Sequence, residues 1–142
     1  MRAATVLVGS VEVLRALTAM VVIEVRLRTG DLPTTCGRLG VRLDLASGEP
    51  AGEPAVLPRW SRPAVRVSHA VVAVWPGGSC LRRCLLVGHR LRTLDPVLRI
   101  GVRRDGARFA AHSWLEIDGK SLDPTATDFP VLAAPGAHPD PS

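Results

Sequence analysis

The dipeptide Asp118-Gly119 constrains the fold of this chain more than any other feature, because it is typical of a two-residue β-hairpin turn of type I′. Residue character alternates through residues 110–117, as expected for a strand that leads into such a turn. A two-residue turn fixes the register of the strands and makes Asp123 the diagonal neighbour of His112. Diagonal neighbours lie roughly 7–8 Å apart, which side chains can bridge. The hairpin therefore predicts a His112–Asp123 pair.

Two other carboxylates are close to His112 in the sequence, and both are poorly placed to orient it. Asp118 occupies the turn, and Glu116 is four residues along the same strand, about 13 Å away at the rise of a strand. A β-bulge between His112 and Asp123 would reverse the parity of the pairing. Without such a bulge, Asp123 is the expected partner.

Cys80 follows the sequence Pro76-Gly77-Gly78-Ser79, in which the glycines break a preceding helix and the serine suits an N-cap. We therefore expect a helix that begins at Cys80 and runs to about Arg92. The unpaired N–H groups and the positive dipole end of a helix N-terminus favour the anionic form of a sulfur placed there. Cys80 is thus the candidate nucleophile, and a structural cysteine is the simpler alternative.

The other two cysteines are expected to be buried thiols. Cys84 lies on the stripe that the Cys80 helix would bury, and Cys36 has no local partner. The buried stripe is expected to comprise Leu81, Cys84, Leu85, Gly88 and Leu91. Three cysteines without a spaced framework are typical of a reducing compartment, which indicates the cytoplasm.

A metal site made of Cys80, Cys84 and His89 is a further possibility. It lacks the two close ligand pairs that are typical of structural zinc. We therefore expect neither a metal nor a cofactor.

The chain has four histidines, at positions 69, 89, 112 and 138. His138 lies in a Pro-rich tail, His89 falls on the outer face of the Cys80 helix, and a core or surface role is more common for His69. His112 is the candidate general base, because its strand brings a carboxylate to it.

The chain contains no Asn and no Gln, so no side-chain amide is available for a catalytic triad or an oxyanion hole. The backbone N–H of Cys80 is one expected oxyanion donor. The second would come from Gly77-Gly78 or from the indole of Trp75, for which packing is the simpler role.

Taken together, these residues resemble the transglutaminase-like cysteine protease superfamily. His112, in the sequence Ala-His-Ser-Trp-Leu-Glu, follows Cys80 by 32 residues, and Asp123 follows His112 by 11. Within the superfamily, three sequences are similar to lasso-peptide leader peptidases of the microcin-processing type: Cys-Leu-Arg-Arg at 80–83, Ile-Gly-Val at 100–102 and Ala-His-Ser-Trp-Leu-Glu at 111–116. The resemblance covers about residues 60–124 well and the N-terminal third loosely.

The resemblance implies Cys80 as nucleophile, His112 as general base and acid, and Asp123 as the orienting acid. It implies a cysteine protease that removes the leader from a ribosomally made lasso-peptide precursor. The implied partners are that leader, a separate leader-binding protein and the lasso cyclase; the leader-binding protein is expected in trans, because no room for it precedes residue 60. The alternatives are a transglutaminase-like acyltransferase and a non-catalytic peptide-binding scaffold.

The length of 142 residues suits a single domain of the α+β class, with N-terminal helices and a nucleophile-bearing helix packed on a small antiparallel sheet, in a transglutaminase-like or papain-like core. We expect an N-terminal helical segment over 1–45, a flexible linker over 46–58, the core over 59–126 and a mostly disordered tail over 127–142.

Residues 3–27 predict a core helix that ends near Gly30. Four charges interrupt this apolar run and argue against a membrane span: Glu12, Arg15, Glu24 and Arg26. Asp31 is expected to begin a turn, followed by a short segment through Cys36, Leu39, Val41 and Leu43.

Ser61 and Pro63 predict the start of a helix to about Val74, although its β-branched residues leave a strand open. Strands are expected over 96–103 and 109–117, joined by a turn at 104–106. The net charge of +5 is carried by 17 Arg and one Lys against 13 acids, with aromatic residues at 4%. No basic block alternates with aromatic rings, so nucleic acid is not an expected partner.

Overall fold

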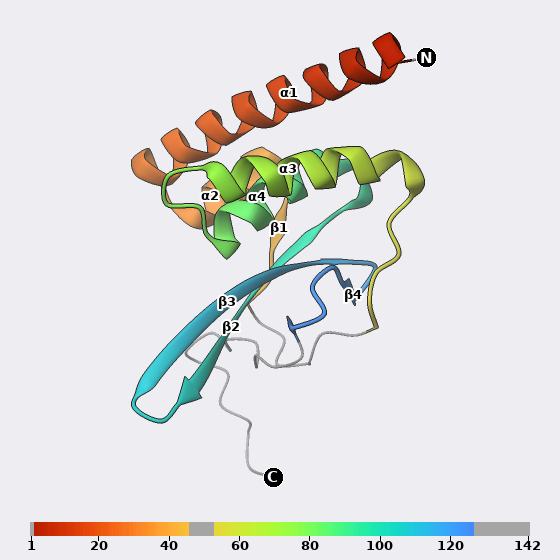
Figure 1. Cartoon of the computed structure of the whole chain (residues 1–142). Helices are drawn as coiled ribbons and strands as arrows, with labels where there is room; N and C mark the ends of the chain where they lie inside the picture. Colours follow the sequence, from red (N-terminus) through yellow and green to blue (C-terminus); the bar gives the residue numbers. More distant parts are fainter. Residues whose placement is uncertain (1, 46–52, 127–142) are drawn as a thin grey trace.

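The computed structural model of the chain describes residues 2–45 and 53–126 (Figure 1). The predicted tail and residues 46–52 of the predicted linker lie outside this part. The elements follow in this order: α1 (Arg2–Thr29), α2 (Leu32–Leu39), β1 (Arg42–Leu43), η1 (Arg59–Ser61), α3 (Arg62–Val74), α4 (Cys80–Arg90), η2 (Arg92–Leu94), β2 (Val97–Asp105), β3 (Arg108–Ile117) and β4 (Lys120–Ser121). The α+β class predicted from the sequence is confirmed.

The strands form one sheet in the order β1-β2-β3-β4. β2 pairs antiparallel with β3, and β3 pairs antiparallel with β4. β1 lies parallel to β2, with Arg42 opposite Val97. The sheet is therefore mixed rather than wholly antiparallel. Parallel neighbours need a crossover connection, and here α3 and α4 lie within it.

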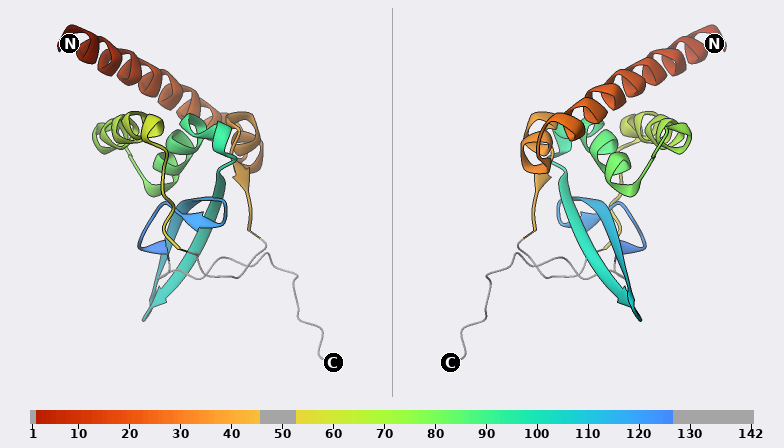
Figure 2. Two further views of the ribbon diagram at one scale, coloured as in Figure 1. Left: turned by 90° about the vertical axis from the view of Figure 1, so that its right-hand side faces the viewer. Right: turned by 90° about the vertical axis from the view of Figure 1, so that its left-hand side faces the viewer.

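The helices gather in a layer at one end of the sheet, and the β2–β3 hairpin extends away from them (Figures 1 and 2). α4 lies at the centre and contacts α1, α3, β2 and β3. Its inner face is buried from Cys84 to Gly88. A Cβ on Gly88 would lie 2.7 Å from Val41 Cγ2, so glycine at this position permits the close packing of α4. The predicted stripe is buried, except that Leu81 is only half-buried.

α1 is a helix as predicted, but it is a core helix on one side only. Ala16, Met20 and Ile23 are buried. Several large apolar residues of the same helix are exposed: Val11, Val13, Leu14, Leu17, Val21, Val22 and Val25. No helix within the described residues is long and apolar enough to cross a membrane.

Two acidic residues of α1 hold it against α4. Glu24 accepts hydrogen bonds from Arg82 Nε at 2.8 Å and Nη2 at 3.2 Å. Glu12 pairs with Arg90 at the other end of α4. Because the earlier glutamate of α1 pairs with the later arginine of α4 and the later glutamate with the earlier arginine, α1 and α4 run antiparallel.

The short segment expected after the turn at Asp31 forms the helix α2, which had not been predicted from the sequence. Asp31 is its N-cap and accepts a hydrogen bond from Thr34 N at 2.7 Å. Gly40 ends the helix in the left-handed region, with φ 74°. Asp31, Pro33 and Gly40 mark the two ends of this eight-residue helix in the sequence.

Two further boundaries differ by a few residues. The β2–β3 turn is Gly106-Ala107 rather than 104–106, because Asp105 pairs with Arg108. The Cys80 helix ends at Arg90 rather than about Arg92. The segment that begins at Ser61 is the helix α3 and not a strand.

Candidate active site

Cys80 is the first residue of α4, as predicted from the Gly-Gly-Ser lead-in. The N-cap Ser79 has extended backbone angles, and its Oγ accepts a hydrogen bond from Arg82 N at 3.4 Å. A Cβ on Gly78 would lie 2.3 Å from Val72 O, so this position has no room for a side chain. The loop therefore needs glycine in order to bring Cys80 to the start of the helix.

The β3–β4 hairpin has the predicted register, with Glu116 opposite Ser121 and Ile117 opposite Lys120. Asp118 and Gly119 have φ values of 51° and 72°, both in the left-handed region that a type I′ turn requires. Leu122 N donates to Leu115 O at 2.9 Å and continues the pairing beyond β4. No bulge therefore interrupts the strands between the turn and this pair.

This register brings the predicted pair together, with His112 Nε2 and Asp123 Oδ2 2.6 Å apart. The other carboxylate oxygen of Asp123 accepts hydrogen bonds from Thr125 N at 2.8 Å and Thr125 Oγ1 at 2.7 Å. Burial raises the pKa of Asp123, but the hydrogen bonds from Thr125 and His112 outweigh it and lower the pKa below its ordinary value. An ionised Asp123 accepts from Nε2–H, which leaves Nδ1 as the ring nitrogen for proton exchange.

Glu116 is engaged elsewhere and does not compete with Asp123 for the imidazole. Its Oε1 accepts from Trp114 Nε1 at 3.1 Å, and its Oε2 accepts from Arg99 Nε at 3.1 Å. The buried Trp114 in turn stacks beside the His112 ring, with centroids 6.2 Å apart and planes at 24°. Glu116 thus supports the position of His112 indirectly, by fixing the indole beside it.

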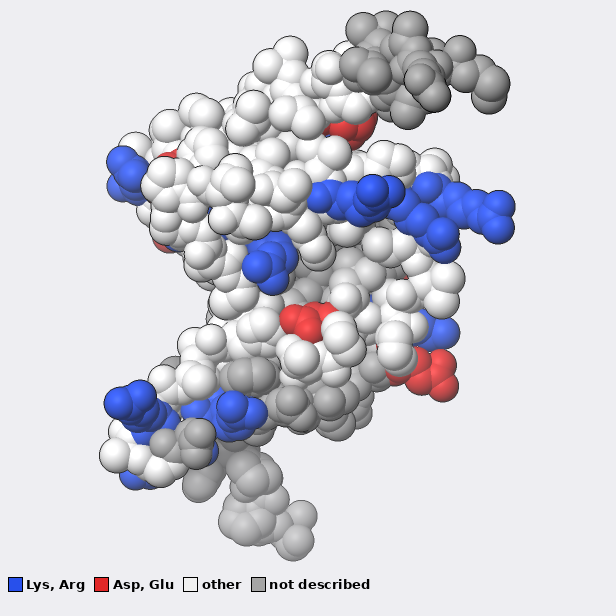
Figure 3. Space-filling model, in the orientation of Figure 1, with Lys and Arg blue, Asp and Glu red and all other residues white. Residues whose placement is uncertain are grey.

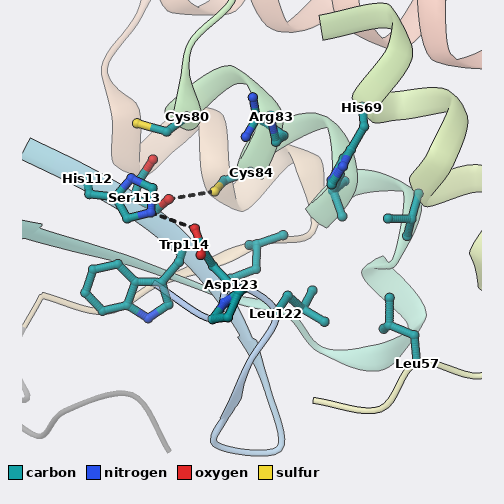
Figure 4. A pocket seen from close by; sticks show the side chains of 14 residues that line it. Leu57, His69, Cys80, Arg83, Cys84, His112, Ser113, Trp114, Leu122 and Asp123 are labelled. Carbon is teal, nitrogen blue, oxygen red and sulfur yellow. Dashed lines mark hydrogen bonds and ion pairs between the residues drawn. The ribbon is translucent and has the colours of Figure 1, made fainter. Parts of the chain in front are cut away.

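Cys80, His112 and Asp123 line one cavity of about 290 Å³ between α3, α4 and the hairpin (Figure 4). The structure thus brings the three predicted site residues together from two distant parts of the chain. Much of the remaining wall is apolar: Leu57, Val65, Val87, Leu115 and Leu122. Leu57 belongs to the predicted linker, whose described part lies along β4 with Ala55 N donating to Ser121 O at 2.7 Å.

Cys84 also borders the cavity, but its thiol is buried and neutral. Its Sγ donates to Ser113 O at 3.3 Å. Burial raises the pKa of Cys84 to about 12. Cys80 is only half-buried. Of these two thiols, Cys80 is therefore the one available to a substrate.

Of the three histidines that were set aside, His138 lies outside the described residues, and the other two have different positions. His89 lies away from the cavity, and its Nδ1 is 3.0 Å from Leu39 O. His69 lines the cavity together with Arg83 (Figure 4). Loss of water around the ring and the charge of Arg83 lower the pKa of His69. Val65 and His69 are four residues apart, so a helix places them on the same face. Only the packing of α3 in the structure shows that this face borders the cavity.

Ser113 is a second residue that sequence reasoning missed. Its side chain borders the cavity and is buried, and its Oγ has no hydrogen-bond partner within the described residues. Of the predicted oxyanion donors, Gly78 N is already bonded to Trp75 O at 2.9 Å. Trp75 packs against the hydrophobic core, which agrees with the simpler role foreseen for it. The N–H of Cys80, at the first position of α4, has no acceptor within the helix.

A family model described as the transglutaminase-like superfamily matches residues 19–133. The chain belongs to the transglutaminase-like superfamily. The match includes all three site residues and begins at residue 19, within α1. Comparisons with curated proteins and with solved structures found no match.

Transglutaminase-like domains are commonly cysteine proteases or acyltransferases. Both activities proceed by transfer of an acyl group to a cysteine sulfur, and they differ in whether water or an amine then accepts it. A half-buried thiol at a helix start and an imidazole held by a carboxylate are the groups that this chemistry needs. The site of this transglutaminase-like chain is therefore suited to acyl transfer.

Proposed function

We propose that the protein is a cysteine peptidase that removes the leader from a ribosomally made lasso-peptide precursor. The observation that carries the chemistry is the 2.6 Å contact between His112 and Asp123 in the cavity that Cys80 lines. The peptidase subtype is supported by the resemblance of residues 80–83 and 111–116 to leader peptidases. Cys80 is the nucleophile, His112 the general base and acid, and Asp123 the group that orients the imidazole.

In the first half-reaction, His112 Nδ1 takes the proton of the Cys80 thiol, and the sulfur attacks the scissile carbonyl carbon. The C–N bond then breaks, a thioester forms, and the imidazolium gives its proton to the leaving amine. Asp123 stabilises the imidazolium, because its carboxylate is already ionised and hydrogen-bonded to Nε2. The N–H of Cys80 donates to the developing oxyanion.

In the second half-reaction, His112 removes a proton from water as the water attacks the thioester. The C–S bond breaks, the leader is released as a carboxylic acid, and the thiol is restored. The amine freed in the first step is the new N-terminus of the core peptide. A separate lasso cyclase would join this amine to a carboxylate side chain.

Leader recognition is assigned to a separate leader-binding protein. We expect the purified peptidase to cleave a precursor slowly and the leader-binding protein to accelerate cleavage. Equal rates with and without that protein would contradict this part of the proposal. They would leave the chemistry at Cys80 untouched.

The test is incubation with a leader-containing precursor, followed by mass spectrometry of the products. The wild-type protein should give two peptides whose masses sum to the precursor plus one water. Cys80→Ala should abolish cleavage, whereas Cys36→Ala, which removes a buried thiol of α2, should retain it. Unchanged cleavage by the Cys80→Ala variant would reject Cys80 as the nucleophile. No cleavage by the wild-type protein, even with the leader-binding protein present, would favour a non-catalytic peptide-binding scaffold.

The second candidate is an acyltransferase, which the family match also supports. The same thioester would then be attacked by an amine. Adding a small primary amine to the assay distinguishes the two functions, because an acyltransferase yields a product that carries the amine in place of water.

A further inference from the structure

The positive charge of this chain is concentrated in the segment that builds the helical wall of the cavity. Residues 54–94 contain no Asp and no Glu. The same stretch has seven arginines: Arg59, Arg62, Arg66, Arg82, Arg83, Arg90 and Arg92. It spans η1, α3 and α4, and Val65, His69 and Cys80 all line the cavity. The helical segment on one side of the cavity therefore carries a net positive charge.

Some of these arginines have structural roles. Arg82 is held by Glu24 at 2.8 Å, and Arg90 pairs with Glu12. Arg92 donates to His89 O at 3.0 Å. The remaining four are exposed, and no carboxylate of the described residues lies within ion-pair distance of them: Arg59, Arg62, Arg66 and Arg83. We call these four residues the basic rim.

The basic rim is continuous with the cavity. On α3, Arg62 and Arg66 precede Val65 and His69 by three residues each, so all four share one face of the helix. Val65, His69 and Arg83 line the cavity itself. Figure 3 shows Lys and Arg side chains along the helical edge of a hollow between the helices and the sheet.

The positive charges at the start of α3 do not stabilise that helix. Arg59 and Arg62 lie at the N-terminal end of α3, which has no acidic residue in its first turn. The macrodipole favours negative side chains there and disfavours positive ones. Burial lowers the pKa of His69, and the charge of the nearby Arg83 lowers it further. This uncompensated positive potential is available to an anionic ligand.

We propose that the basic rim binds an acidic stretch of the peptide substrate whose scissile bond lies at Cys80. The inference rests on the proposed function, because it takes the occupant of the cavity to be a peptide. Arg62 and His69 are about 10 Å apart along the axis of α3. About three residues of an extended peptide span that distance. A substrate with acidic residues a few positions from the scissile bond can therefore contact the rim while its carbonyl is at the nucleophile.

The experiment measures how fast Cys80 is alkylated by charged and neutral peptides. The probes are N-iodoacetyl-tetraglutamate, N-iodoacetyl-tetraglutamine and iodoacetamide, and the site of labelling is located by mass spectrometry. In each reaction the sulfur forms a bond to the methylene carbon, iodide leaves, and the thiol proton passes to the buffer. Labelling needs a reactive thiol and no turnover, so it separates the rim from the complete peptidase reaction.

The acidic probe should label Cys80 about tenfold faster than the neutral peptide at low salt. The ratio should approach one at about 0.5 M salt, where exposed charges are screened. The variant with Arg62→Gln and Arg66→Gln should lose most of this preference. The matched control, with Arg104→Gln and Arg108→Gln, has the same change of net charge on exposed residues beside the β2–β3 turn and should keep it.

A ratio near one between the labelling rates of the acidic and neutral peptides, with normal labelling of the wild-type protein by iodoacetamide, would overturn the proposal for the basic rim. Cys80 would remain the proposed nucleophile. Equal losses in the two double variants would also overturn it, because net charge alone would then explain the preference. If oligouridylate slowed the labelling of Cys80 by iodoacetamide and tetraglutamate did not, the basic rim would be assigned to nucleic acid instead. Failure of every reagent to label Cys80 would overturn both the rim and the proposed function.

Discussion

His112 Nε2 and Asp123 Oδ2 lie 2.6 Å apart, although ten residues and a hairpin turn separate them in the chain. The pair depends on the two-residue turn, since a shift of one residue would move Asp123 to the other face of the hairpin. Ser121 fixes the carboxylate further: its Oγ donates to Asp123 O at 2.9 Å and accepts from Asp123 N at 3.0 Å. The orienting acid is therefore held by backbone as well as by side-chain contacts.

Asp123→Asn should lower kcat by about 10²–10⁴-fold with little change in melting temperature. An amide keeps the size of the side chain but cannot stabilise an imidazolium. The control is Asp95→Asn, which removes an exposed carboxylate 3.3 Å from Arg42 and should leave kcat within about twofold. Equal effects of the two substitutions on kcat would contradict the assigned role of Asp123.

Iodoacetamide at neutral pH should modify Cys80 and spare the other two cysteines. Burial raises the pKa of Cys36 to about 11 and that of Cys84 to about 12, so both remain protonated and inaccessible. Peptide mapping by mass spectrometry after a short exposure checks this expectation. Labelling of Cys84 in the folded protein at a rate similar to that of Cys80 would contradict the structure of the cavity.

The Glu24–Arg82 pair should make stability depend on pH between about 4.5 and 2. The hydrogen bond from Arg82 lowers the pKa of Glu24 from 4.5 to about 2. A lowered pKa gives a contribution to stability that is present above the ordinary value and is lost as the pH falls through the folded one. Glu24→Gln should thus lower the melting temperature at pH 7, and the difference from wild type should shrink toward pH 2.

The matched control for this effect is Glu53→Gln. Glu53 is 84% exposed and lies 3.6 Å from Lys120. The melting temperature of the Glu53→Gln variant should equal that of the wild type at every pH, because an exposed ion pair contributes little to stability. A constant difference between the Glu24→Gln variant and the wild type across this range would contradict the ion pair with Arg82.

Gly78→Ala and Gly37→Ala should change stability in opposite directions. The new Cβ at position 78 would lie 2.3 Å from Val72 O, so the loop before Cys80 must shift, at a cost of about 1–3 kcal/mol. Position 37 lies within α2 with no atom within 4 Å of a new Cβ, and alanine should stabilise it by about 0.5–1 kcal/mol. Denaturant unfolding measures both changes, and Gly78→Ala should also slow the labelling of Cys80.

The parts of the site that could be predicted from the sequence are those that depend on neighbours in the chain. Asp118-Gly119 set the register that joins His112 to Asp123, and Ser79 with its two preceding glycines placed Cys80 at the start of α4. The buried stripe of α4 followed from helical periodicity. Turn geometry and capping act within a few residues, so the sequence determines them directly.

Tertiary structure alone decided which of these local features meet and what surrounds them. The parallel pairing of β1 with β2, the exposed apolar side of α1 and the position of His69 and Arg83 at the cavity all depend on segments that are far apart in the chain. A helix pattern shows that one face is apolar, but not which element will cover it. That choice is made by side-chain packing and ion pairs, such as Glu24 with Arg82, which form only when the whole chain folds.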